Sequence, residues 1–489
     1  MAVIRVDVAP GRLRPAERFG LDVLIDLSRL LVAEQAECNV VRLTVVDRPY
    51  SELPAADLVP RVALERADGE VRVSTAALYA VAETAGGAAE QRSGAVDRHG
   101  RVPPEENPLV AAGRSREPLV SILAAELRKA AGEVAERRPM RFLAPWPNGY
   151  RWAALVTHDL DVVERWILFP FLRMAELSRR GMWRLTARVA RAASRSIGHD
   201  PVTHGVHALL QLEAHHGIPA TWFVICSEPT LRSLLAGDST YRPDAPTTHR
   251  ILNAVGQAGH EIGLHGSFAT VGDAGRLASQ RRWLGQLTQR TVTGVRQHFL
   301  RMRPGATQRA MVKAGFEYDA TWGFADRNGF RLGVADVVPA WDDARAAVMP
   351  LDLVPLIWMD RALSKYAGVE DARRWVEDGL QLARASRAVE GTWVGLWHPN
   401  STEALGFPGA EAALVHLLQT LANERPYFAT ARKIIEWRRF RRSVRAAHIS
   451  ADGRVVLTAM PGYSTVAIED AAGDTTQAPV RSEQASGAA

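Results

Sequence analysis

Two carboxylates separated by one residue close an apolar run, in the stretch LVTHDLD at residues 155–161. Asp159 and Asp161 stand at positions i and i+2, so in a continuing strand both side chains project from one face. Two carboxylates this close remain ionised together only when a cation or a strong donor compensates them. A divalent metal on one and an arginine on the other would do so, leaving one acid free to act as a base. The alternative interpretation is a solvated acid pair at a strand end.

Other polar side chains stand at or near the ends of neighbouring apolar runs. They are His265, Arg296, His298, Asp360 and His398, while Asp319 lies within the fifth run. In a parallel α/β architecture the carboxyl ends of all strands lie on one face, where sites are built. We therefore expect these residues to form one site with Asp159 and Asp161. His260 opens its run instead of closing it, and we expect it to be structural.

The rhythm of residues 152 to about 440 predicts the fold that would gather these residues. Short apolar runs lie at 153–159, 220–225, 260–265, 294–299, 318–322, 354–360 and 393–398. Helical lengths lie at 203–216, 247–258, 273–289, 304–314, 370–389 and 409–423. This alternation predicts an α/β fold with parallel strands and crossover helices. An open doubly wound sheet and a closed (β/α) barrel both fit the pattern.

The 489 residues divide into four predicted regions. We expect an N-terminal α/β accessory domain at 1–145 and the site-bearing domain at 146–440. A short β extension is expected at 441–474 and a disordered tail at 475–489. The composition, 47% hydrophobic and 23% charged, is typical of a globular protein and excludes a disordered or membrane-embedded chain.

Cysteine usage and the N-terminus bear on location. Cys38 and Cys226 are far apart and lack metal-ligand spacing, so we expect no disulfide framework and a reducing compartment. The first residues show no apolar signal segment, and no apolar run reaches the ~18–20 residues of a membrane span. We expect a cytoplasmic protein.

One segment, a helical insertion at 164–198, carries the net charge of +6, with eight arginines and two glutamates. Its arginines recur at helical spacing, at Arg180, Arg184, Arg188, Arg191 and Arg195. A basic helix behind the aromatic stretch 166–172 is typical of peripheral contact with an anionic partner, such as the inner face of a membrane. The alternative is the solvated face of an ordinary insertion. Because the charge is confined to this segment, we expect no nucleic-acid partner.

Five motifs, THDLD, GHEIGLH, VRQHF, DATW and LWH, resemble in order and spacing those of the polysaccharide deacetylases, the NodB-homology domain of carbohydrate esterase family four. The resemblance covers about residues 150–435. The stretches HGIPATWFVI and AGFEYDATWGFADRNGFRLG are similar to a cytoplasmic branch with an N-terminal α/β region. The resemblance implies a distorted (β/α) barrel with fewer than eight strands and a divalent metal at its C-terminal face. It also implies hydrolysis of an N-acetyl amide with release of acetate.

The resemblance implies a role for most of the site residues. Asp159 matches the general base, Arg296 the arginine that orients it, and His398 the histidine that protonates the departing amine. Asp161 and His265 match metal ligands. The residues expected to contact substrate are Trp322, which matches an aromatic wall, and the two acids Asp319 and Asp360.

The sequence departs from the family pattern at one ligand position. Ala269 stands where the family has a second metal histidine, so one protein ligand is lacking. We predict His298 as the replacement, with His158 as the weaker alternative. An Asp/His ligand set favours Zn²⁺ and leaves Co²⁺, Ni²⁺ or Mn²⁺ open.

Three functions stay open. The favoured one is a metal-dependent carbohydrate N-deacetylase, a hydrolase acting on an N-acetylated amino sugar in a glycan or a glycan precursor. The precursor would be a nucleotide sugar or a lipid-linked sugar. The second is hydrolysis of a non-sugar or cyclic amide. The third is a catalytically decayed scaffold that binds glycan or membrane, which Ala269 favours and the remaining motif residues oppose.

Overall fold

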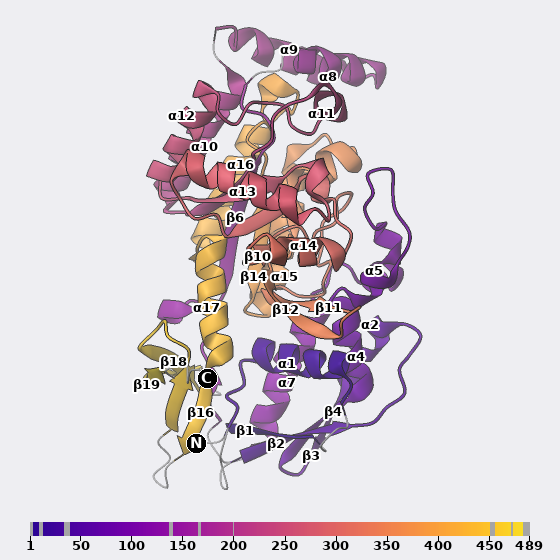
Figure 1. Ribbon diagram of the computed structural model, residues 1–489, viewed down its shortest axis with the longest axis vertical. Helices are drawn as coiled ribbons and strands as arrows, with labels where there is room; N and C mark the ends of the chain where they lie inside the picture. The colour runs from indigo at the N-terminus through magenta and orange to yellow at the C-terminus, as the bar shows by residue number, and fades with distance from the viewer. Residues whose placement is uncertain are drawn as a thin grey trace.

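The computed structural model describes residues 3–8, 13–33, 40–135, 140–164, 168–198, 200–449, 455–470 and 473–482. The strands form three sheets, and the largest carries the predicted site residues. The molecule is elongated, with the two smaller sheets at one end and helices α8 (Leu168–Arg179) and α9 (Trp183–Arg195) at the other (Figure 1). None of the helices in these ranges is both long and apolar enough to cross a membrane.

The central sheet consists mainly of parallel strands linked by helices, as the alternation predicts. Five expected strands form where they were predicted: β6 (Ala153–Leu160), β7 (Ala220–Ile225), β8 (Glu261–Gly266), β9 (Gly294–Gln297) and β14 (Thr392–Leu396). They pair in parallel in the order β9-β8-β7-β6-β14. Almost every residue in them is buried, because helices cover the sheet.

The six expected helices also form. They are α10 (Pro201–His216), α12 (Pro246–Gln257), α13 (Ala274–Thr288), α14 (Ala306–Lys313), α15 (Ala372–Ala388) and α16 (Ala410–Asn423). A short helix not predicted from the sequence, α11 (Leu231–Ala236), follows β7. Both α11 and α8 follow strands whose carboxyl ends lie on one edge of the sheet, the edge where the site was expected.

Part of the central sheet differs from the prediction. Strands β10 (Tyr318–Asp319) and β13 (Trp358–Met359) are two residues long, shorter than the runs that predict them. A hairpin of β11 (Val338–Asp342) and β12 (Ala347–Leu353) extends the sheet beside β10, and β15 (Tyr427–Phe428) pairs with β6. In the described ranges the sheet has ten strands, more than the fewer than eight expected.

The chain after β12 passes from the β10 side of the curled sheet to the β14 side. The Val354 amide donates to the Asp319 carbonyl at 2.9 Å, on the β10 side. Three residues later the Ile357 amide donates to the Val394 carbonyl at 3.1 Å, on the β14 side. These backbone hydrogen bonds connect the two sides through one short segment, without a continuous strand ladder at this point.

The N-terminal region has its own four-stranded sheet. Its strands are β1 (Val3–Asp7), β2 (Val40–Val46), β4 (Glu70–Ser74) and β3 (Leu64–Ala67), in that order. Its helices are α1 (Pro15–Ser28), α2 (Pro54–Asp57), α3 (Pro60–Ala63), α4 (Thr75–Thr84), α5 (Ala88–Arg92), α6 (Pro108–Ala111) and α7 (Leu119–Val134). The region shares a hydrophobic core with the central one, and Phe19 packs on Trp341 with ring centroids 5.1 Å apart.

A third sheet unites the C-terminal strands with β5 (Phe142–Leu143). Its strands are β16 (Arg445–Ile449), β17 (Val455–Ala459), β19 (Thr475–Ser482) and β18 (Thr465–Glu469), with β5 beside β18. The expectation of disorder from residue 475 is therefore wrong for 475–482, and 483–489 lie outside the described residues. The polar composition misleads because β19 obtains its hydrogen bonds from a partner strand on each side.

Helix α17 (Ala431–Ser443) links the N-terminal region to the central region through a buried arginine. Arg438 is fully buried and forms ion pairs with Asp26 of α1 at 3.0 Å and with Asp336 at 2.8 Å. Burial raises the pKa of Asp336 to about 6, against the lowering effect of Arg438. The charge of this carboxylate therefore depends on the arginine.

Replacing Arg438 with leucine should lower the free energy of unfolding by about 1.5–3 kcal/mol, the value of a hydrogen bond to a charged group. Asp336 would lose its ion pair at 2.8 Å and keep Arg441 at 3.7 Å, while Asp26 would keep Arg442 at 2.9 Å. Urea denaturation of the full chain measures this change. Arg432→Leu is the matched control, since Arg432 is exposed on the same helix and, among the described residues, its side chain forms an ion pair with Glu436 alone. It should cost no more than about 0.5 kcal/mol. Equal stabilities of the two variants would show that Arg438 does not join the regions.

Candidate functional site

The strand-end residues meet on one face of the central sheet. Asp159 lies at the end of β6, and His265 and Arg296 are register partners on β8 and β9. Asp161 and His398 follow the ends of β6 and β14, which pair directly. Parallel pairing in this register brings the four chain segments to one edge, as the sequence predicts.

Three of these side chains form a group that could hold a metal ion. One ligand atom from each of Asp161, His265 and His298 lies within 4.8 Å of the others. Asp161 Oδ1 is 3.3 Å from His265 Nε2 and 3.5 Å from His298 Nε2. The arrangement supports the choice of His298 over His158 as third ligand.

The other nitrogen of each imidazole is already bound. His265 Nδ1 lies 2.9 Å from the Arg296 carbonyl, and His298 Nδ1 lies 2.9 Å from Asp238 Oδ1. A neutral imidazole that donates from Nδ1 presents a lone pair at Nε2. A carboxylate or carbonyl behind a histidine is the usual support of a metal-binding imidazole. Both Nε2 atoms therefore face Asp161 in the state that binds a cation.

The charge on Asp161 also fits a cation. Its Oδ1 atom is buried and accepts no hydrogen bond from any residue that the structure describes. Burial alone would raise the pKa of Asp161, but the charges of His298 and His398 and the contact with His265 outweigh burial and lower that pKa. A divalent metal supplies the same compensation without protonating the imidazoles, so the residues fit Zn²⁺ or a similar ion.

His298 reaches the group because the chain turns sharply after β9. The strand ends at Gln297, two residues earlier than predicted, and Phe299 and Leu300 then adopt φ values of 59° and 52°. Bulky residues rarely occupy this left-handed region, and each such residue costs about 1–3 kcal/mol. The Phe299 ring packs on His298 with centroids 4.2 Å apart. Strain at this turn is thus coupled to the position of the third ligand.

Neither Ala269 nor His158 belongs to the group. Ala269 lies exposed in the short turn after β8. His158 is fully buried, with Nε2 2.7 Å from Glu213 and Nδ1 2.8 Å from the Trp397 carbonyl. His260 is also structural, since its Nδ1 accepts the amide of Ala220 at 2.9 Å.

Asp159 is held by Arg296, as expected for an oriented base. Arg296 Nη1 donates to Asp159 Oδ1 at 2.8 Å and to Thr157 Oγ1 at 3.0 Å, and its Nε donates to the Ala320 carbonyl. The guanidinium is fully buried over the Phe223 ring. Asp159 Oδ2 is left facing the metal-binding group, 3.6 Å from His265 Nε2.

A second Asp–His pair holds His398. His398 Nδ1 lies 2.5 Å from Asp360 Oδ1, and the Ser401 hydroxyl and the His398 amide donate to Asp360 Oδ2. Burial would raise the pKa of Asp360, but the charge of His398 outweighs it and lowers that pKa. His398 Nε2 points to Asp161, 3.7 Å from Oδ2. Asp360 is fully buried, so its expected contact with substrate is wrong and its role is to position His398.

The other two expected substrate contacts are also wrong, because both side chains are buried. Trp322 is 1% exposed and packs against Gly87 of the N-terminal region, with the Arg331 guanidinium over its ring. Asp319 is fully buried and accepts hydrogen bonds from Thr321 and Gln308. Both residues support the scaffold beneath the site.

Three residues near the site were missed by sequence reasoning. Asp238 lies in the loop after α11, where no motif marks it. Arg361 and Lys365 lie at a single π-helical turn, Ala362–Tyr366, a feature that is frequent at functional sites. A lysine and an arginine four residues apart directly after Asp360 are the signal that would have pointed to them.

Arg361 and Lys365 place positive charge beside Asp161. Arg361 donates to the Asn400 side chain at 2.8 Å, and Lys365 is exposed above the Phe299 ring. Desolvation by the surrounding protein lowers the pKa of both groups, and Arg361 further lowers that of Lys365. Within the described part of the chain neither cation forms an ion pair with a carboxylate.

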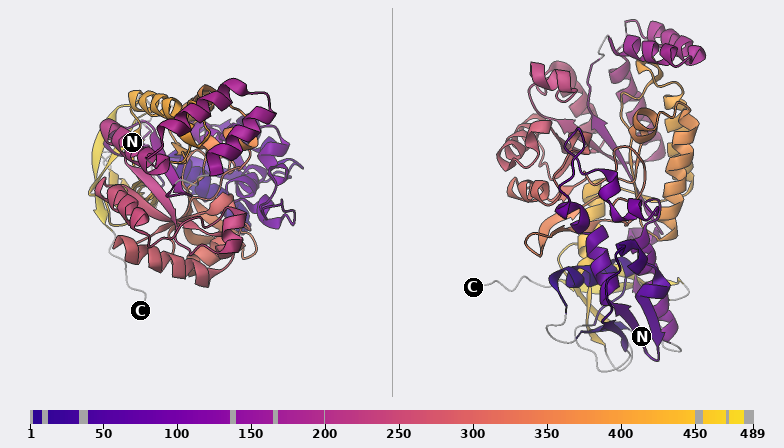
Figure 2. Two further views of the ribbon diagram at one scale, coloured as in Figure 1. Left: turned by 90° about the horizontal axis from the view of Figure 1, so that it is seen from above. Right: turned by 90° about the vertical axis from the view of Figure 1, so that its right-hand side faces the viewer.

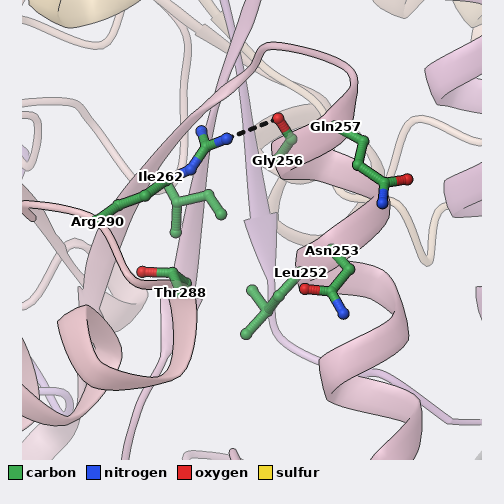
Figure 3. Close-up of a pocket in the computed structure, with 7 residues that line it drawn as sticks. All are labelled: Leu252, Asn253, Gly256, Gln257, Ile262, Thr288 and Arg290. Carbon is green, nitrogen blue, oxygen red and sulfur yellow. Dashed lines mark hydrogen bonds between the residues drawn. The ribbon is translucent and has the colours of Figure 1, made fainter.

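A pocket of about 180 Å³ elsewhere in this region is not part of the site. Four residues of α12, together with Ile262 of β8, Thr288 and Arg290, line it (Figure 3). Arg290 crosses it and donates to the Gly256 carbonyl at 2.7 Å. It lies at the amino-terminal end of β8, opposite the end that bears His265.

Comparison with known families and with curated proteins gives no match. Among solved structures, the chain is similar to a candidate polysaccharide deacetylase from Mycobacterium smegmatis, with 20% identity, 61% of this chain and 93% of that chain covered, and a TM-score of 0.41. The PuuE allantoinase is 18% identical, with coverages of 60% and 91% and a TM-score of 0.38. A CE4 family pseudoenzyme from Bacillus anthracis is 10% identical, with coverages of 59% and 66% and a TM-score of 0.27. Because these similarities are remote, they do not decide whether the chain functions like the deacetylase, the allantoinase or the pseudoenzyme.

The ligand assignment predicts that His298→Ala loses its metal. Elemental analysis of dialysed protein should show the content falling from about one Zn²⁺ per chain to less than about 0.2, because two ligands rarely retain zinc. His207→Ala is the control, since His207 is an exposed histidine on α10. Unchanged stoichiometry in the His298 variant would remove that residue from the ligand set.

Asp238→Asn should weaken zinc binding about 10–100-fold without abolishing it, because the amide no longer supports the His298 imidazole with a negative charge. Competition with a chromogenic chelator measures the affinity. An affinity equal to that of the unmodified protein would show that Asp238 does not act through His298.

Proposed function

We propose that the protein is a metal-dependent hydrolase that removes the N-acetyl group from an amino sugar in a glycan or a glycan precursor. One observation carries the proposal: the group of Asp161, His265 and His298 lies between two oriented partners, Asp159 and His398. A metal group flanked by a base and an acid is the equipment that amide hydrolysis needs. The resemblance of the motifs to polysaccharide deacetylases supports the choice of an N-acetyl amide.

Asp161, His265 and His298 would hold the metal, which when bound polarises the amide carbonyl and acidifies water. Asp159 accepts a proton from the attacking water at Oδ2, since its Oδ1 atom is engaged by Arg296. His398 donates a proton from Nε2 to the departing amine. Asp360 keeps that imidazole in position and stabilises its charged form. Acetate and a free amine are the products.

The cations beside the site support an anionic substrate. Arg361 and Lys365 have no carboxylate partner in the described ranges, and Lys365 is accessible to solvent. A phosphate on the substrate would supply the missing counter-charge through charge-assisted hydrogen bonds. We therefore propose a phosphorylated sugar precursor, nucleotide- or lipid-linked, used on the cytoplasmic side of the membrane.

Asp159→Asn should lower the rate of acetate release about 10²–10⁴-fold, because asparagine cannot accept the proton. Elemental analysis should show unchanged metal content, since Asp159 is not among the three ligands. Retention of activity by this variant would exclude Asp159 as the base. Loss of the metal would instead make Asp159 a ligand.

Acetate release and ring opening separate the proposal from its alternatives. The metal-loaded protein should release acetate from phosphorylated N-acetylglucosamine and leave small cyclic amides intact. Ring opening without acetate release would make the protein a cyclic-amide hydrolase. Tight binding of the acetylated sugar without turnover would indicate a decayed scaffold.

Lys365→Gln should raise the KM for N-acetylglucosamine 1-phosphate about 10-fold, the value of one charge-assisted hydrogen bond. The KM for unphosphorylated N-acetylglucosamine should not change, and neither should kcat. Lys313→Gln, at an exposed lysine on α14, is the control. Equal effects on the two substrates would contradict recognition of a phosphate by Lys365.

A further inference from the structure

The hairpin of α8 and α9 exposes an unusual concentration of large apolar side chains. Phe171, Leu172, Trp183 and Ile197 are each more than half exposed, and Trp183 reaches 67% and Ile197 75%. Leu231 and Leu234 of α11 add two more, 76% and 50% exposed. Of the twelve large apolar side chains that are exposed in the described residues, five thus belong to these three helices and a sixth, Ile197, lies two residues beyond the end of α9. Such concentration marks an interaction surface.

The arginines of the hairpin divide into two groups. Arg173 and Arg180 form ion pairs with Glu370, each at 2.5 Å, and Arg188 pairs with Glu403. These three fix the hairpin to the chain segments around the site, because Glu403 lies shortly after His398. The stripe predicted from the sequence is therefore partly a structural anchor.

The second group of arginines is exposed and free of ion pairs in the part of the chain that the structure describes. It consists of Arg179, Arg184, Arg191 and Arg195. Their charge has no carboxylate partner, and they share the hairpin with the exposed Phe171, Leu172 and Trp183. Exposed apolar side chains together with uncompensated arginines match a bilayer surface that carries anionic headgroups.

The position of the surface relates it to the site. Helices α8 and α11 follow the carboxyl ends of β6 and β7, the end at which Asp159 and Asp161 lie. Figure 2 shows the α8–α9 hairpin at one end of the molecule, away from the two smaller sheets. A bilayer bound there would lie next to the site.

We propose that the face formed by α8, α9 and α11 docks on an anionic membrane surface. Phe171, Leu172, Trp183, Leu231 and Leu234 would enter the headgroup region, and the unpaired arginines would contact lipid phosphates. This docking goes beyond the proposed hydrolysis and does not depend on it, since none of these residues belongs to the site.

Flotation of the full chain with vesicles tests the proposal. The protein should float with phosphatidylcholine vesicles that contain 30% phosphatidylglycerol, and much less with pure phosphatidylcholine, and 0.5 M salt should release it. Failure to float with the anionic vesicles would overturn the proposal.

Two sets of variants assign the binding to this face. The triple change Arg184→Glu, Arg191→Glu and Arg195→Glu should weaken vesicle binding by about 100-fold or more, since each basic residue contributes about fivefold. The double change Phe171→Ser with Trp183→Ser should also weaken vesicle binding. The binding that remains should still be released by 0.5 M salt, because the arginines are unchanged. Both proteins should keep the melting temperature of the unmodified chain, because the changed side chains are exposed.

The control reverses the charge of three exposed arginines elsewhere that form no ion pair within the described ranges: Arg61→Glu, Arg282→Glu and Arg384→Glu. It carries the same net charge as the triple variant and should float like the unmodified protein. An equal loss of vesicle binding in the control would show that net charge alone explains the effect, and it would overturn the proposal. A protein that ignores vesicles and forms a dimer disrupted by Trp183→Ser would show that the face binds a second copy instead.

Discussion

The site depends on one electrostatic constraint: two carboxylates, Asp159 and Asp161, must remain charged two residues apart at a buried strand end. Each is compensated differently. Arg296, fully buried, donates to Asp159 and fixes it, while Asp161 presents to two imidazoles an oxygen that accepts no hydrogen bond from the described residues. A cation between those imidazoles satisfies Asp161 without competing for Asp159. The pair is thereby separated into one ligand and one base, which is the division that hydrolysis requires.

The remainder of the scaffold orients the groups around this pair. Every histidine of the site is held from behind at Nδ1, by the Arg296 carbonyl, by Asp238 or by Asp360. All three imidazoles therefore present Nε2 to one point. Holding the imidazoles in this orientation requires a strained turn at Phe299 and Leu300. The packing of the surrounding regions on one another supports that turn. Preorganisation of this kind distinguishes a site from a chance cluster of polar residues.

Sequence periodicity predicted the parallel strands and the face on which the acids and histidines meet, because both follow from local patterns. It also indicated His298, since that residue closes an apolar run. It failed for Trp322, Asp319 and Asp360: position at a strand end says which edge a residue occupies, not what packs over it. The N-terminal region and Gln308 cover two of them, and His398 engages the third. Asp238 could not be predicted from the sequence, because only the conformation of its loop brings it to His298. Strand β19 was missed because its stability comes from distant partner strands.

The central claim is that Asp161, His265 and His298 together bind one divalent metal. A crystal grown with Zn²⁺ and measured on both sides of the zinc absorption edge tests it most directly. The account predicts one anomalous peak about 2.0–2.2 Å from the Nε2 atoms of both histidines and from an Asp161 oxygen. A zinc ion bound without His298, or a site that stays empty at saturating Zn²⁺, would contradict it.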